Sequence, residues 1–281
     1  MRLLAFLCLA FPMTIAATAI TRAALPAAGD LVKASLLADT TAVQPGQPFR
    51  VGVLLKIAPQ WHVYWQNPGE GGIPTTITLR LPEGFVASPV QYPMPLRFSL
   101  PGGLYAFGYE DQVMLLVTIT PPAKIDSSSV TIGADGNWLV CEKVCVAGDA
   151  SLSLALPVGA TKRADHQDLF NEWSGKLPVP IASARNVASY RQSSNGSELS
   201  LRIEWKGPVP SDLEWFPPAS DALMFNNVRI DTQGSTTTIS TTVERLPGQT
   251  VASTLPDSVL AFRTAAGRSG LAVPVKFEAR K

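Results

Sequence analysis

Two cysteines, Cys141 and Cys145, are the residues of this chain whose type and spacing best fit chemistry. They stand four residues apart in the segment WLVCEKVCVAG, which runs from Trp138 to Gly148. Such a pair can form a structural disulfide, bind a metal with additional ligands, or exchange electrons as a dithiol–disulfide couple. These three chemistries place different demands on the elements that hold the pair.

The spacing requires the chain to bend if the two cysteines bond to each other. On a straight strand they would lie about 13 Å apart, roughly twice the Cα separation that a disulfide tolerates. We therefore expect a bulge or a tight hairpin around Glu142 and Lys143. The flanking residues favour strand over helix because most are aromatic or β-branched: Trp138, Leu139, Val140, Val144 and Val146.

A disulfide that closes so small a ring contributes little loop-closure entropy and tends to be easier to reduce. This favours redox chemistry, although closely spaced structural disulfides also occur and that interpretation stays open. A metal site would need further ligands. The candidates His62, Met94 and Met114 show no spacing that ties them to the pair, so no metal is expected.

The N-terminal segment predicts export. An arginine is followed by an apolar run from Leu3 to Ile15 and then by small residues, with Ala17 and Ala19 spaced as in a cleavage site. We expect residues 1–19 to be a signal peptide cleaved near Ala19, which would remove the third cysteine, Cys8. The mature chain is then expected to contain no transmembrane segment and to lie in a compartment that permits disulfides.

Composition excludes several function classes. The chain has 23 basic and 22 acidic residues and a net charge of +1, without long single-sign runs, so no nucleic-acid partner is expected. With two histidines it supports no hydrolytic site, and no phosphate-binding or other cofactor motif is present. No cofactor is therefore expected.

Short alternating strands and frequent turn residues, with 24 prolines and 21 glycines, predict an all-β fold of two β-sandwich domains in tandem. The predicted divisions are a signal peptide (1–19), a first domain (30–158), a connection (159–180) and a second domain (181–281). The connection can hold one short helix with the apolar stripe Leu169, Phe170 and Trp173, ending at Gly175. Clear strand patterns cover 49–58, 75–82, 112–121, 197–205 and 235–244, and a closing hairpin is expected to turn near 267–270.

Three stretches in order resemble one family. WHVYWQNPGEGGIPTTITLRLPEGF (61–85), GYEDQVMLLVTITPP (108–122) and WLVCEKVCVAGDASLSLALP (138–157) are similar to the periplasmic N-terminal domain of the DsbD and ScsB type of membrane thiol–disulfide reductase. The ScsB-like branch is the more similar. LEWFPPASDAL (213–223) and the closing hairpin resemble the second β-domain of that branch.

This resemblance implies immunoglobulin-like domains and a periplasmic location, with Cys141 and Cys145 as the redox couple and Cys145 forming the mixed disulfides. Aromatic residues of a neighbouring loop shield the pair in the family, and Phe98, or alternatively Tyr105, matches that position. Electrons would come from a thioredoxin-like protein or domain fed by a membrane conduit, and both are expected as separate partners because the chain ends at Lys281. The chain would then be one component of a protein-disulfide reductase system, acting as a redox relay. The alternatives are a non-catalytic binding module with a structural disulfide and a copper-handling protein.

Overall fold

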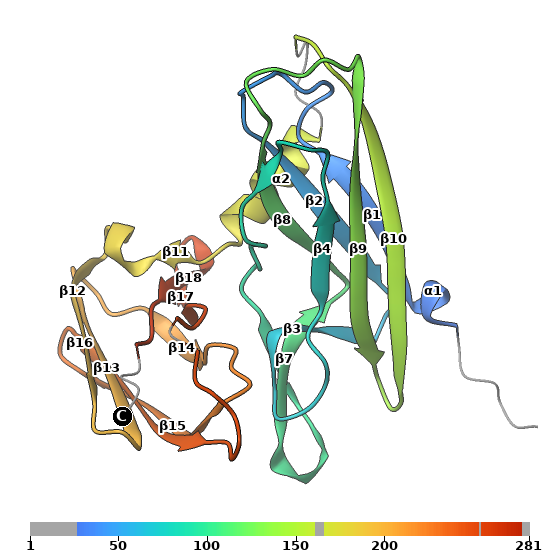
Figure 1. The fold of residues 1–281 in the computed structure, drawn as a ribbon. Coiled ribbons are helices and arrows are strands. Elements are labelled where there is room, and N and C mark those ends of the chain that lie inside the picture. The colour runs from blue at the N-terminus through green and yellow to red at the C-terminus, as the bar shows by residue number, and fades with distance from the viewer. Residues whose placement is uncertain (1–26, 161–165, 253, 277–281) are drawn as a thin grey trace, which may run out of the picture.

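The protein folds as two β-sandwiches that follow each other along the chain (Figure 1). The structure is a computed structural model that describes residues 27–160, 166–252 and 254–276, so the expected signal peptide lies outside the described residues. The expectation of an all-β fold with immunoglobulin-like sandwiches is confirmed. Within the described ranges, no helix is both long and apolar enough to cross a membrane.

The first sandwich packs a four-stranded sheet against a six-stranded sheet. Hydrogen-bonded neighbours are antiparallel in both sheets. The short helix α1 (Ala28–Leu31) precedes the first strand, and the 3-10 turn η1 (Pro101–Gly103) connects β6 to β7. The four-stranded sheet has the order β1 (Val32–Ala38), β2 (Phe49–Ile57), β8 (Gln112–Thr120) and β5 (Val86–Ala87). The six-stranded sheet has the order β10 (Cys145–Pro157), β9 (Ser129–Cys141), β3 (His62–Gly69), β7 (Tyr105–Glu110) and β6 (Leu96–Ser99), and β4 (Thr76–Arg80) also pairs with β9.

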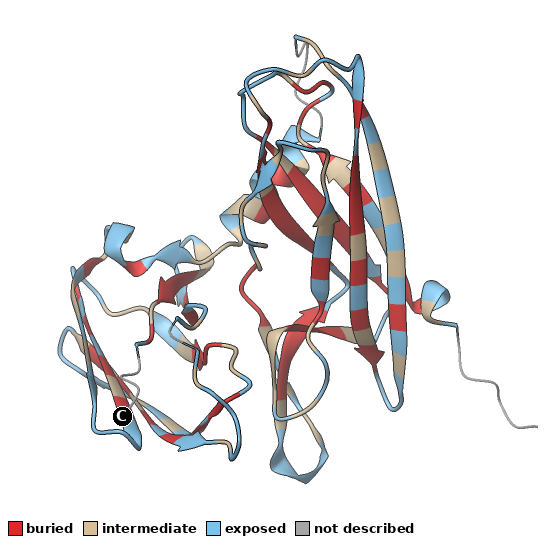
Figure 2. Ribbon diagram, viewed as in Figure 1, coloured by how far each residue is buried: buried red, intermediate tan, exposed pale blue. Residues whose placement is uncertain are grey.

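Burial follows the position of each strand in the sandwich (Figure 2). The central strands β2 and β8 are buried along almost their whole length, whereas β10 at the sheet edge alternates between exposed and partly buried residues. This difference is typical of an edge strand with one face in water. The fully buried side chains of the first core include Leu55, Trp65, Phe107, Leu115, Ile119 and Ile132.

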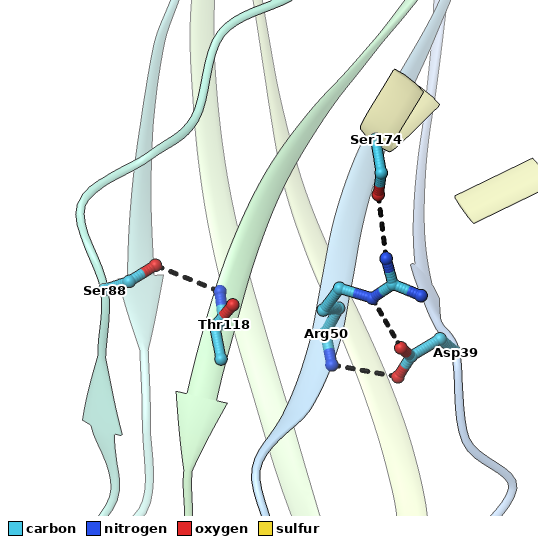
Figure 3. Close-up of polar contacts among 5 residues, drawn as sticks. All are labelled: Asp39, Arg50, Ser88, Thr118 and Ser174. Atoms are coloured by element: carbon cyan, nitrogen blue, oxygen red, sulfur yellow. Dashed lines mark hydrogen bonds and ion pairs between the residues drawn. The ribbon is translucent and has the colours of Figure 1, made fainter. Parts of the chain in front are cut away.

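The predicted helix of the connection is confirmed as α2 (Gln167–Gly175). Of its apolar stripe, Phe170 and Trp173 are buried in the core of the first sandwich. The guanidinium of Arg50 lies 5.4 Å from the ring centroid of Phe170 and donates at 2.7 Å both to Asp39 Oδ2 and to Ser174 Oγ (Figure 3). The helix is therefore docked on the first sandwich and does not form a loose spacer.

A second polar contact in the same view holds the end of the short strand β5. Ser88 Oγ accepts a hydrogen bond from the backbone N–H of Thr118 at 3.0 Å (Figure 3). Together with the backbone bond from Ser88 N–H to Thr118 O at 2.8 Å, it closes this edge of the four-stranded sheet.

The second sandwich contains two four-stranded sheets around its own core. One has the order β11 (Val179–Pro180), β18 (Gly267–Val273), β17 (Ser258–Thr264) and β14 (Ser211–Phe216). The other has the order β12 (Val187–Ser194), β13 (Glu198–Trp205), β16 (Thr236–Arg245) and β15 (Leu223–Gln233). The 3-10 turn η2 (Ile181–Ser183) lies between β11 and β12. Its most buried core residues include Leu199, Leu201, Ile203, Trp215, Ile239 and Leu260.

The turn of the closing hairpin was predicted at the wrong place. Thr264 pairs with Gly267, so the loop consists of residues 265–266, and residues 267–270 already belong to β18. The Thr264 hydroxyl closes the loop, because it accepts from the Ala266 N–H and donates to the Gly267 carbonyl, both at 3.2 Å. Gly270 lets this strand approach the first sandwich closely: a Cβ there would lie 2.5 Å from Met94 Sδ, so the methionine side chain would have to shift.

The two sandwiches contact each other through apolar residues of the second sandwich that join the first core, Phe216, Val259 and Ala261, and through polar contacts around them. Phe216 of β14 is fully buried and lies edge-on to Trp65 and Phe107, with ring centroids 6.1 and 5.0 Å away. Arg268 donates to the Pro95 carbonyl at 2.6 Å, and Asn67 donates to the Pro217 carbonyl at 3.0 Å. The second sandwich therefore rests on β3 and on the hairpin of β6 and β7.

We predict that Phe170→Ala destabilises the protein by about 3–5 kcal/mol, because a fully buried ring is removed and the site can collapse only in part. Chemical unfolding followed by circular dichroism measures the change. Glu172→Ala on the exposed face of the same helix is the control, and its effect should stay within about 0.5 kcal/mol. Equal effects of the two substitutions would show that α2 is not part of the first core.

Candidate redox site at the end of the long hairpin

The two cysteines form a disulfide at the closed end of the hairpin of β9 and β10. Cys141 is the last residue of β9, Cys145 is the first of β10, and their Cα atoms are 4.2 Å apart. The predicted tight hairpin around Glu142 and Lys143 is confirmed, with residues 142–144 as its loop. The chain reverses fully between the cysteines, which brings them close enough to bond, whereas a straight strand would hold them too far apart.

The pairing of the two strands places the cysteines opposite each other. The register runs without a shift from Pro157 opposite Ser129 to Cys145 opposite Cys141. In the loop, the Glu142 N–H donates to the Val144 carbonyl at 3.1 Å, and the Lys143 N–H donates to Glu142 Oε2 at 2.9 Å. The long ladder therefore sets the disulfide geometry, and the loop only has to close it.

The two cysteines have very different surroundings. Cys141 is only 2% exposed and lies in a small apolar cluster with Tyr64 and Ala106, against which Phe98, Leu100 and Leu139 pack. Cys145, in contrast, is exposed at the tip of the hairpin. A thiolate arriving from solvent therefore reaches the residue Cys145 far more easily than Cys141.

The cluster around Cys141 lies on the outer face of the six-stranded sheet, away from the sandwich core. Along β3, Val63 and Trp65 belong to the main core, whereas Tyr64 belongs to the small cluster. Gly72 allows the neighbouring loop to lie against Tyr64, because a Cβ there would be 2.2 Å from the Tyr64 ring. Side chains from β3, β6 and β7 thus surround the buried cysteine from one side.

Phe98 and Tyr105, the two candidates for a shielding residue, lie on opposite faces of the hairpin of β6 and β7. Phe98 pairs with Ala106 and joins the cluster of Cys141. Tyr105 instead lies beside Phe107, with ring centroids 5.1 Å apart, and 4.5 Å from the Arg97 guanidinium carbon. Burial is the main cause that raises the pKa of Tyr105; Glu70 raises it further and Arg97 opposes both.

The sequence did not connect His62 to the pair, yet His62 lies directly opposite Cys141 where β3 pairs with β9. Its ring stacks on Phe98 at a centroid distance of 4.7 Å and 18° between planes, and meets Tyr64 edge-on at 5.2 Å. Its Nε2 is buried and has no hydrogen-bond partner among the described residues. Burial lowers the pKa of His62 below its usual 6.5.

The charged groups near the site are few and lie at its margins. Glu110 on β7 lies opposite His62, on the side away from Cys141, and is exposed. In the hairpin loop, Glu142 and Lys143 form an ion pair with 3.3 Å between Oε1 and Nζ. Among the residues that the structure describes, no three His, Cys, Asp or Glu side chains come together as metal ligands. Met114, considered from the sequence as a metal ligand, is fully buried in the first core.

We predict that, in the reduced protein, Cys145 reacts with iodoacetamide faster than Cys141 by on the order of tenfold or more, because burial both hinders access and disfavours the thiolate. Timed alkylation followed by peptide mass spectrometry measures the two rates separately. Under denaturing conditions the two rates should converge, which serves as the control. Equal rates in the folded protein would contradict the asymmetry.

The chain is similar to several known proteins. Residues 31–157 match the family model described as "Thiol:disulfide interchange protein DsbD, N-terminal". The N-terminal periplasmic domain of ScsB from Proteus mirabilis matches 89% of this chain and 95% of its own, with a TM-score of 0.64 and 16% sequence identity. Tandem titin immunoglobulin domains match 89% of this chain and 99% of their own at 10% identity, with a TM-score of only 0.23. No curated protein matches the sequence.

Proposed function

We propose that this chain, whose residues 31–157 form a DsbD/ScsB-type N-terminal domain, relays electrons through Cys141 and Cys145 in thiol–disulfide exchange. The observation that carries the proposal is the asymmetric disulfide at the hairpin tip, with one exposed and one buried cysteine. This inequality suits exchange, since one sulfur bonds to the partner and the other resolves the intermediate.

The proposed reaction starts when a thiolate of a reduced thioredoxin-like partner attacks Cys145 Sγ. The bond between Cys141 and Cys145 breaks, Cys141 Sγ leaves with the electron pair, and a mixed disulfide joins Cys145 to the partner. The partner's second thiolate then attacks its own sulfur in the mixed disulfide and releases Cys145 as a thiolate. The partner leaves as a disulfide, and the two electrons and two protons it has lost reside on Cys141 and Cys145. The reduced pair then passes these electrons and protons to the disulfide of a substrate protein: Cys145 attacks that disulfide, and Cys141 resolves the mixed disulfide.

Phe98 is the proposed shield of the pair. It packs on the cluster that contains Cys141 and stacks on His62, so it covers the resolving cysteine while Cys145 stays exposed. Tyr105 faces the other side of the hairpin and contacts Arg97 and Phe107. We therefore assign the shielding role to Phe98.

The proposed setting is the periplasm, with residues 1–19 as a signal peptide cleaved near Ala19. The electron donor would be a thioredoxin-like protein or domain, supplied in turn by a separate membrane conduit. The family description supports the exchange chemistry, and the ScsB domain that resembles this chain is itself described as periplasmic.

The reduction potential of the couple tests the proposal against a purely structural disulfide. We expect a value near or above about −230 mV, which suits exchange with thioredoxin-like proteins. Equilibration with glutathione buffers, followed by alkylation and mass spectrometry, measures it. A value below about −300 mV fits a structural bond and would refute the relay.

The roles of the two cysteines are tested by trapping. Cys141→Ser should accumulate a mixed disulfide between Cys145 and a purified thioredoxin, because the resolving sulfur is absent. Cys145→Ser should not, since the remaining thiol at Cys141 is buried. Non-reducing electrophoresis detects the complex, and equal trapping by both variants would overturn the assignment.

A further inference from the structure

His62 and Cys141 form a cross-strand pair on the face that carries the disulfide. They are directly opposite each other in the antiparallel pairing of β3 with β9. Side chains at such positions share a face, with Cβ atoms about 4.5–5.5 Å apart. The imidazole is in contact with two aromatic rings, stacked on Phe98 and edge-on to Tyr64.

The buried position of Cys141 creates a chemical requirement that Cys145 does not have. When Cys141 attacks or leaves, its sulfur passes through a thiolate inside an apolar cluster, where the charged form is disfavoured. A group beside it must therefore take up or deliver the proton. The other cluster members are unsuited: Ala106, Phe98, Leu100 and Leu139 are apolar, and burial raises the pKa of Tyr64 above 10, so its hydroxyl keeps its proton at neutral pH.

The neighbouring acids are no better placed for this task. Glu110 lies across β3 from Cys141, on the far side of His62. Glu142 is engaged by the Lys143 side chain and by the Lys143 N–H. Within the described part of the chain, His62, the residue opposite Cys141, carries a buried Nε2 that has no hydrogen-bond partner.

We propose that His62 is the proton-transfer residue for Cys141. In the resolving step, His62 Nε2 takes the proton of the Cys141 thiol, and Cys141 Sγ attacks Cys145 Sγ in the mixed disulfide. The bond between Cys141 and Cys145 forms, the bond from Cys145 to the partner breaks, and the partner sulfur leaves with the electron pair. The pair is oxidised, the partner is reduced, and the imidazolium later releases its proton to solvent. In the reverse direction the imidazolium protonates the departing Cys141 Sγ.

The surroundings of His62 suit it to this role. Because burial lowers the pKa of His62, the imidazole is neutral at neutral pH and has a lone pair free to accept a proton. Stacking on Phe98 holds the plane of the ring, so the residue proposed to shield the pair also positions its base. General base catalysis of this kind contributes on the order of 10²-fold or more.

A single reagent isolates the step. The reduced protein, with Cys8→Ser in every variant, is mixed with the aromatic disulfide dithiobis(nitrobenzoate), and the released aromatic thiolate is followed by absorbance. The first release reports attack by the exposed Cys145, and the second reports attack by Cys141 on Cys145. His62→Phe keeps a ring to stack on Phe98 but cannot carry the proton, so the second release should slow on the order of 10²-fold at neutral pH while the first stays within twofold.

The pH profile separates proton transfer from packing. In the wild type the second rate should be nearly independent of pH between the titrations of the imidazole and of the thiol. In His62→Phe it should instead rise about tenfold per pH unit until the thiol itself ionises, so the two profiles converge at high pH. A slowing of equal size at all pH values, or no slowing, would overturn the proposal.

Two further variants complete the design. His62→Gln should behave as His62→Phe does, and it provides the test if the phenylalanine variant does not fold. His166→Gln replaces the other histidine of the chain, at the start of α2, and should match the wild type.

The inference rests on the proposed relay, but the reagent needs no protein partner. A wild type that ignores thioredoxin refutes the relay, whereas identical reagent profiles for His62→Phe and wild type refute the role of His62.

Discussion

The antiparallel register of β9 is the constraint on which the site depends. On one side it places Cys145 opposite Cys141, and on the other it places His62 opposite Cys141. A shift of one residue in either pairing would turn the cysteine toward the opposite face of the sheet, because side chains alternate along a strand. Thirteen residues of β9 are paired with β10 without a shift in register. This continuous pairing fixes the positions of the two cysteines at the closed end of the hairpin.

The hairpin of β6 and β7 lies between the face that carries the disulfide and the second sandwich. One of its faces carries Phe98 and Ala106 toward Cys141. Its other face carries Arg97, whose guanidinium carbon lies 4.5 Å from the Tyr105 ring centroid and 5.3 Å from that of Phe107. Phe107 in turn packs edge-on against Phe216 of the second sandwich. The second sandwich therefore supports the back of the hairpin whose front covers the buried cysteine.

A ring of polar contacts surrounds this aromatic junction. Glu214 lies between two arginines, 3.8 Å from Arg97 and 3.6 Å from Arg268. Each of these pairs is partly exposed, so its contribution to stability is small, and burial of Phe216, Val259 and Ala261 in the first core supplies the main attraction between the units. The ion pairs instead restrict which residues meet, since Arg268 also donates to the Pro95 carbonyl at the start of the hairpin.

Local pattern in the sequence determined the elements of this protein. Sequence patterns marked β2, β8, β13 and β16 closely, and the stripe of Phe170 and Trp173 marked α2. In β13, β16 and α2 the pattern shows which face avoids water, whereas β2 and β8 are buried on both faces. The impossibility of a disulfide on a straight strand likewise required a reversal between Cys141 and Cys145. The turn after Thr264 was placed too late because Gly267, with φ of 114°, ends the loop and begins β18, and the Thr264 hydroxyl bonds across the two loop residues.

Only the tertiary structure decided what surrounds the pair. His62 is remote from Cys141 in the sequence and became its neighbour through strand pairing, which no local spacing encodes. Phe98 and Tyr105 are close in the sequence but lie on opposite faces of their hairpin, so that Phe98 packs on the cluster of Cys141 and Tyr105 lies beside Arg97. The tertiary structure also buries Cys141 and leaves Cys145 exposed, a difference that the sequence does not show. Local residue types thus specify the strands. The contacts around the disulfide instead come from strands that are distant in the chain, and the packing of whole sheets selects the order of those strands.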